Sequence, residues 1–99
     1  MEKVINHIIN YATAENPIAN YQLSSLFNIS EVAIRKHINR ARCEGIPICA
    51  SSKGYYYSTD KADILDTIQS LNNRTIAVEK AIGGLLTALI DDRTEESKI

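Results

Sequence analysis

The feature that most constrains the fold is an apolar repeat in the last third of the sequence. Its members are spaced alternately four and three residues apart: Ile64, Ile68, Leu71, Thr75, Val78, Ile82, Leu85 and Leu89. This spacing predicts one long helix over residues 61–91 that carries a heptad seam. At about 1.5 Å per residue the seam is roughly 40 Å long. A small N-terminal domain cannot easily cover that length, so we expect two or more copies of the chain to pair through the seam.

The alternative is that this helix packs along its own domain.

Thr75 is a polar residue at an a position of the heptad, where it helps to fix the register of a pair. Gly83 and Gly84 lie off the seam and weaken the helix by roughly 2 kcal/mol relative to alanine. We expect a kink at the glycines, or close packing against a second helix.

Two short helices are expected before residue 28. Apolar residues at helical spacing predict the first over residues 2–14, and Pro17 prevents its continuation. Asn20 is the expected N-cap of the second helix. The apolar stripe of that helix consists of Leu23, Leu26 and Phe27. Asn28 follows, and it predicts a tight turn because asparagine tolerates the left-handed conformation.

A third, basic helix is expected from residue 31 to about residue 44, between an N-cap at Ser30 and a stop at Gly45. Ile34, Ile38 and Ala41 share the face that packs on the domain, and Arg35, Lys36, Asn39 and Arg40 point away from it. Residues 30–54 hold five basic residues against two acidic ones, in a chain whose net charge is −1. The sequence therefore predicts one local basic face.

A β-hairpin follows the third helix. Residues 46–50 and 55–58 read as strands, and residues 51–54 form the turn between them, with Lys53 at the tip. Three consecutive tyrosines, residues 55–57, offer a stacking platform for single-stranded nucleic acid. Since neighbouring strand residues face opposite sides, at least one tyrosine is expected in the core instead.

Together these patterns predict a mainly α fold with a small β-hairpin. The expected domains are a winged helix-turn-helix over residues 1–58 and an oligomerisation helix with a polar tail over residues 59–99. Two helices joined by a turn to a third amphipathic helix, followed by a hairpin, is the order of elements in winged helix-turn-helix proteins.

The stretch SEVAIRKHINRARCEGIPICASSKGYYYS resembles the winged-helix DNA-binding domain at the N-terminus of the bacterial biotin ligase–repressor, and its relatives among bacterial and phage regulators. The resemblance covers about residues 1–58. It is carried by Leu23, Leu26, Ile29, Ser30, Ala33, Ile34, Lys36, His37, Ile38, Gly45, Lys53, Gly54 and Tyr55. Asn28 stands where this family usually has glycine. Residues 59–99 lie outside the resemblance and hold no catalytic domain, so biotin ligation is not implied.

The resemblance implies a regulator of transcription or replication that binds double-stranded DNA, of phage or bacterial origin, and the heptad seam adds the expectation that it is a dimer. Arginine pairs well with guanine and asparagine with adenine in the major groove, where the helix over residues 31–44 is expected to lie. The candidate DNA-binding residues are Ser30, Arg35, Lys36, Asn39, Arg40, Arg42 and Lys53.

Three other interpretations stay open. In the first interpretation, the basic face is only a solvent-exposed helix surface that binds no DNA. The pI of 6.1 and the acidic C-terminal region favour a protein-interaction module that binds and inhibits or redirects a host replication or transcription protein. In the third interpretation, the chain is a purely structural oligomerisation unit.

No catalytic motif is visible, so we do not expect an enzyme or a cofactor. Cys43 and Cys49 lack the number and spacing of a zinc site, and we expect Cys43 on the surface and Cys49 in the core. His37 is expected to be packed and hydrogen-bonded rather than a DNA ligand. No apolar run approaches the roughly 18 residues of a membrane span, and we expect a cytoplasmic protein.

Overall fold

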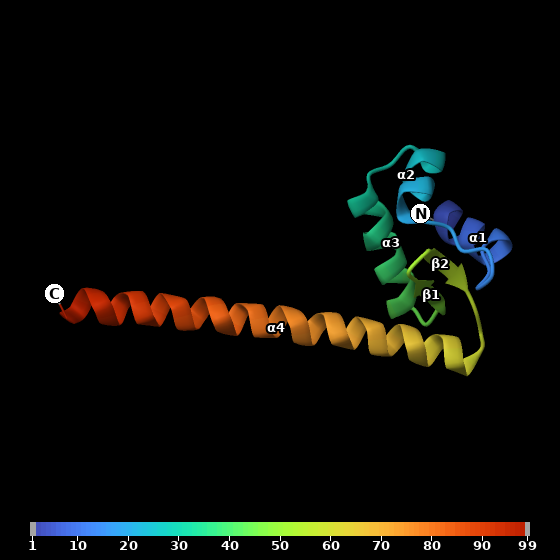
Figure 1. Ribbon diagram of the computed structural model, residues 1–99. Coiled ribbons are helices and arrows are strands. Elements are labelled where there is room, and N and C mark those ends of the chain that lie inside the picture. Colours follow the sequence, from blue (N-terminus) through green and yellow to red (C-terminus); the bar gives the residue numbers. More distant parts are fainter. Residues whose placement is uncertain (1, 99) are drawn as a thin grey trace. The chain divides into compact units, whose positions relative to one another are not determined.

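The computed structural model describes the backbone of residues 2–98 and the side chains of residues 3–90. The elements in chain order are α1 (Glu2–Tyr11), α2 (Asn20–Phe27), α3 (Glu31–Cys43), β1 (Ile48–Ser51), β2 (Gly54–Tyr57) and α4 (Lys61–Lys98) (Figure 1). The expected mainly α fold with a small hairpin and a long C-terminal helix is confirmed. The side chains of the polar tail lie outside the described residues.

The chain divides into two units, Met1–Thr67 and Ile68–Ile99. We call the first unit the head. It extends beyond the expected boundary at residue 58 because the first two turns of α4 pack on it. Ile64 contacts the head's core, and Thr67 is buried. Ile64, the first expected member of the seam, is thus used within its own chain, and the free part of the seam begins at Ile68.

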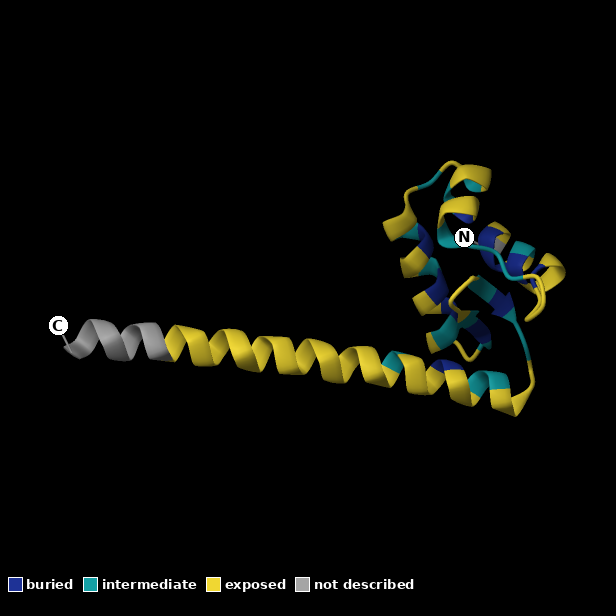
Figure 2. Cartoon of the chain, in the orientation of Figure 1, coloured by how far each residue is buried: buried dark blue, intermediate teal, exposed yellow. Residues whose placement is uncertain are grey.

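The core of the head is mainly aliphatic, as a chain with one Phe and no Trp requires. Its buried members come from α1 and the residue that follows it, α2, α3 and the hairpin (Figure 2): Val4, Ile5, Ile8, Ala12, Leu23, Ile34, Ile38, Ala41, Ile48, Cys49 and Tyr56. Leu26 is 57% exposed, which corrects its expected place in the apolar stripe of α2. Leu23 and Phe27, four residues apart, form the side of α2 that packs on the core.

Local hydrogen bonds explain why the first two helices differ from expectation. α1 ends at Tyr11 instead of residue 14 because Thr13 and Asn16 exchange backbone hydrogen bonds of 3.2 and 3.0 Å in a turn of their own. Asn20 is the first residue of α2 and not its N-cap. The cap position is Ala19, whose N–H donates to Gln22 Oε1 at 2.8 Å.

The turn between α2 and α3 forms as expected. Asn28 has φ 55° and ψ 46°, the left-handed conformation that its residue type tolerates. Ser30 then caps α3, and its Oγ accepts a hydrogen bond of 3.1 Å from Ala33 N–H. These two residues set where α3 begins.

The end of α3 uses residues that the sequence had suggested for a strand. Gly45 has φ +89°, and its N–H donates to Arg42 O at 3.0 Å. Ile46 N–H donates to Ala41 O at 3.0 Å, which completes a Schellman motif. Ile46 therefore belongs to the helix end, and β1 starts only at Ile48.

The antiparallel hairpin pairs Cys49 with Tyr56 and Ser51 with Gly54. Ile18, in the linker between α1 and α2, forms a single β-bridge with this hairpin. Ile18 N–H donates to Tyr55 O and Tyr55 N–H donates to Ile18 O, both at 2.8 Å. The hairpin is thereby attached to the helical part of the head.

Candidate nucleic-acid interface

The surface of α3 is organised by its buried face. Ile34, Ile38 and Ala41 are 0, 1 and 3% exposed, as expected. Because residues four, seven and eleven apart share a face, the side of α3 opposite these residues carries one stripe. We call it the α3 stripe, and its exposed members are Val32, Lys36, Asn39 and Cys43.

Arg35 and Arg40 do not lie on the same side of the α3 stripe. They are five positions apart in the sequence, which corresponds to about 140° around the helix. Arg35 is exposed and lies seven residues before Arg42, on the edge of α3 that faces the hairpin. The single basic face expected from the sequence is therefore a stripe with two separate flanks.

Arg42 joins α3 to the hairpin. It is half-buried, and its Nε donates to Ile48 O at 2.7 Å. Its guanidinium carbon lies 5.9 Å from the centre of the Tyr55 ring, within cation–π range. The side chain thus helps to hold the hairpin against the helix, and its expected phosphate contact stays a prediction.

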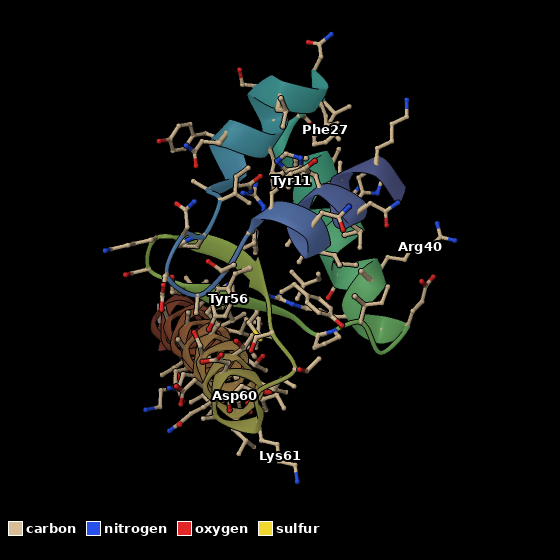
Figure 3. The ribbon with its side chains drawn as sticks, turned by 90° about the vertical axis from the view of Figure 1, so that its right-hand side faces the viewer. Tyr11, Phe27, Arg40, Tyr56, Asp60 and Lys61 are labelled. Atoms are coloured by element: carbon tan, nitrogen blue, oxygen red, sulfur yellow. The ribbon has the colours of Figure 1, made fainter. Side chains whose placement is uncertain are left out.

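Arg40 extends from the opposite flank, and Figure 3 shows it pointing away from the sheet. Its Nε lies 3.6 Å from Glu44 Oε1, with both side chains largely exposed. It borders a shallow groove between α1 and α3 that is also lined by Lys3, Ile9 and His37. Arg40 thus belongs to a different surface from Arg35.

Ser30 and Lys53 lie at the two ends of this region. Ser30 Oγ accepts the capping hydrogen bond from Ala33, and its own hydroxyl proton remains able to donate. Lys53 is exposed at the hairpin tip, where its N–H donates to Ser51 Oγ at 3.2 Å. Both side chains are accessible to a ligand.

Val32 is the residue of this surface that the sequence reasoning missed. It is 54% exposed, although a valine is usually read as a core residue. Its position four residues before Lys36 and seven before Asn39 is the signal that places it on the α3 stripe. An exposed valine there offers an apolar contact of the kind that a thymine methyl group takes.

Cys49, Tyr56 and His7 serve the packing of the head rather than this surface. Burial raises the pKa of the Cys49 thiol, which is 1% exposed, while Cys43 is exposed, both as expected. Tyr56 is 6% exposed, which removes it from a stacking platform. His7 contacts the Phe27 ring, with centroids 5.7 Å apart. Among the described residues, no three metal-ligating side chains form a group that fits a metal ion.

In comparisons with known proteins, no family model, curated protein or solved structure matches this chain. The likeness to winged helix-turn-helix domains therefore stays a prediction. Within the described residues, no helix combines the length and apolar character that crossing a membrane requires.

Proposed function

We propose that the head binds double-stranded DNA with α3 in the major groove. The observation that carries this proposal is the α3 stripe, in which Lys36 and Asn39 are exposed directly opposite the buried Ile34 and Ile38. A recognition helix must pack one face on its domain and present long polar side chains on the other. The winged order of elements, with the β-bridge between Ile18 and Tyr55, supports the same proposal.

The side chains divide into two kinds of contact. Lys36 and Asn39 read base edges from the α3 stripe, assisted by Arg35 on the hairpin side and by the methyl groups of Val32. Ser30 and Lys53 bind phosphates, which fixes the orientation of the head on the duplex. Arg40 lies on the other flank and contributes less.

The protein then acts as a cytoplasmic regulator of transcription or replication. Pairing of two chains through the seam of α4 joins two heads, and a two-fold pair of heads matches two half-sites of DNA. The exposed apolar side chains along α4 support this pairing, since a lone chain leaves them in water.

Duplex binding across a salt series tests the proposal. Fluorescence anisotropy with a random-sequence duplex compares wild type with Lys36→Ala and Arg40→Ala, which remove one positive charge from the α3 stripe and one from its flank beside α1. We expect Lys36→Ala to lower the slope of log affinity against log salt by about 1, and Arg40→Ala to lower it less. The proposal fails if wild type binds no duplex at low salt, or if Lys36→Ala binds as tightly as wild type.

A second candidate is a protein partner for the head. Tyr21, Leu26 and Val32 of α2 and α3 are 65, 57 and 54% exposed, which favours an apolar contact with a replication or transcription protein. Nuclease-treated host lysate passed over immobilised wild type and Leu26→Lys distinguishes the two functions. A stoichiometric partner lost only with Leu26→Lys, together with no duplex binding, supports this candidate. Absence of such a partner argues against it.

A further inference from the structure

We propose that α4 pairs with α4 of a second copy as a parallel, in-register, two-stranded coiled coil, held in register by ion pairs between Arg74 of each chain and Glu79 of the other. This inference rests on the pairing of α4 in the proposed function. It adds the direction, the register and the charged contact of that pairing.

The free seam of α4 is available for a partner. It runs from Ile68 to Leu89, slightly more than three heptads. Leu71 is half-buried, and its other apolar members, Ile68, Val78, Ile82, Leu85 and Leu89, are each more than half exposed. Every described residue from 72 to 90 is exposed.

The residue types along the free seam favour two parallel strands. The a positions hold Ile68, Thr75 and Ile82, all branched at Cβ, and then Leu89. The d positions hold Leu71, Val78 and Leu85. β-branched residues at a combined with leucine at d are the combination that packs best in a parallel pair. The occupant that the seam fits is therefore a copy of itself.

The few charges on this part of α4 identify the direction and register. Residues 67–90 contain only three charged residues: Arg74, Glu79 and Lys80. In the heptad that starts at Ile68, these occupy g, e and f. Neither Arg74 nor Glu79 has an oppositely charged residue three or four positions away in its own helix. The helix by itself thus offers neither charge the usual intrahelical ion pair.

A parallel, in-register pair brings these two charges together. In that arrangement each g residue lies beside the e residue five positions later on the other chain, which pairs Arg74 with Glu79. The two-fold symmetry makes the same contact twice. The following g and e positions are Ala81 and Leu86, so the 54% exposed Leu86 gains an apolar neighbour from the second chain.

Other arrangements lose this contact. In an antiparallel pair, g residues face g residues and e residues face e residues, so Arg74 meets arginine or alanine and never Glu79. A parallel pair shifted by one heptad places Asn72 or Leu86 beside Arg74. Only the parallel, unshifted pair matches the charges, and it joins both heads at the same end of the coiled coil.

Charge exchange tests the ion pair. Arg74→Glu and Glu79→Arg each replace two attractive contacts with two repulsive ones, and sedimentation equilibrium of the full chain should show dimerisation weakened by about 10-fold for each. Arg74→Glu/Glu79→Arg should restore wild-type dimerisation. A mixture of the two single variants should form heterodimers in preference to either homodimer. The ion pair is absent if the double variant dimerises no better than the single variants.

Cross-linking tests direction and register independently of the charges. In a Cys43→Ser background, Ile82→Cys at the a position should form an intermolecular disulfide under mild oxidation, and Lys80→Cys at the outer f position should not. An antiparallel pair places Ile82 opposite Leu71 or Val78, according to its register, so only a mixture of Ile82→Cys with Leu71→Cys or with Val78→Cys would then cross-link efficiently. That pattern would overturn the parallel arrangement.

The outcomes separate this inference from the proposed function. A wild-type mass of one chain in sedimentation would overturn the pairing of α4, and a mass of three or four chains would overturn the two-stranded arrangement. Neither result bears on duplex binding by a single head, which Lys36→Ala and Arg40→Ala report. If the chain dimerises and cross-links at Ile82→Cys but wild type binds no duplex, the inference stands and the proposed function is wrong.

Discussion

Ile18 and Tyr55 exchange two backbone hydrogen bonds of 2.8 Å, which join the linker after α1 to the second strand of the hairpin. This contact brings the chain close to Gly54. A Cβ atom at Gly54 would lie 2.4 Å from Ile18 O and 2.8 Å from Ala19 N. Glycine is therefore required there both for its φ of +146° and for the close approach of a second backbone segment.

Gly54→Ala should destabilise the head severely, because the new methyl group meets backbone and not a movable side chain. The conformation alone contributes about 1–3 kcal/mol, and the clash with Ile18 adds to it. Gly45→Ala is the matched control: Gly45 has φ +89°, but a Cβ there meets nothing within 4 Å. Urea unfolding followed by circular dichroism measures both. Equal losses would show that the Ile18 contact is unimportant.

Thr67→Val should loosen α4 from the hairpin. Thr67 Oγ1 accepts a hydrogen bond of 3.2 Å from Ala50 N–H and donates one of 3.0 Å to Asp63 O. Valine has nearly the same shape but leaves the Ala50 N–H unpaired, at a cost of about 1–3 kcal/mol in the free energy of unfolding.

Thr87→Val is the control for Thr67→Val. The Thr87 hydroxyl donates to Gly83 O at 3.0 Å on an exposed part of α4, so its loss should change stability by less than about 0.5 kcal/mol. Thermal unfolding of both variants gives the comparison. A stable Thr67→Val protein would mean that the start of α4 is not fastened through this hydroxyl.

The head should lose stability in alkaline solution. Burial raises the pKa of Cys49 above its ordinary value of 9.0, and burial together with the Asp63 carboxylate raises the pKa of Tyr56 above 10.0. Both groups therefore lose their protons at a higher pH in the folded state than in the unfolded state. Their contribution to stability is therefore complete below about pH 9 and is lost as the pH rises through the folded-state pKa values.

Urea unfolding at a series of pH values from 7 to 10.5 measures this loss. Tyr56→Phe removes one of the two groups, so the decline should be shallower than in wild type. Tyr11→Phe alters an exposed tyrosine and should leave the profile as it is in wild type. A wild-type profile that is flat up to pH 10.5 would contradict the prediction.

Asn39→Ala and Lys53→Ala should separate base reading from phosphate binding. If Asn39 pairs with adenine, its removal relaxes the preference at one base-pair position by about 1–3 kcal/mol. Lys53→Ala should instead weaken binding to all duplexes alike, since phosphates carry no sequence information. Selection of bound sites from a random duplex pool, followed by competition between them, measures both. An unchanged site preference with Asn39→Ala would remove Asn39 from the base contacts.

Much of the head is predictable from local patterns. The buried face of α3, the turn at Asn28, the cap at Ser30 and the end at Gly45 all follow from residue type and spacing. They are predictable because each depends on the conformational preference of one residue or on the period of one helix. The start of α4 is predictable for the same reason. Its helix continues through Gly83 and Gly84 and ends at Lys98, beyond the expected end at residue 91.

The candidate interface was less predictable, because a helical wheel shows which residues point outward but not what lies beside them. Arg40 and Arg42 are two positions apart, and the helical wheel shows both as basic residues that can reach a ligand. In the structure, Arg42 is engaged by Ile48 and Tyr55, while Arg40 borders the groove beside α1. Which arginine is free to meet a ligand depends on the neighbouring elements.

The sequence by itself determined the mainly α fold, the boundaries of α3 to within one residue, and the heptad repeat with its charges at Arg74 and Glu79. These are properties of consecutive residues, which local backbone preferences and periodicity express directly. Only the tertiary structure decided that Ile18 forms a bridge to the hairpin, that Gly54 must lack a Cβ, and that Ile64 and Thr67 belong to the head. Those features arise where segments far apart in the chain meet, and contacts of that kind leave no periodic mark in the sequence.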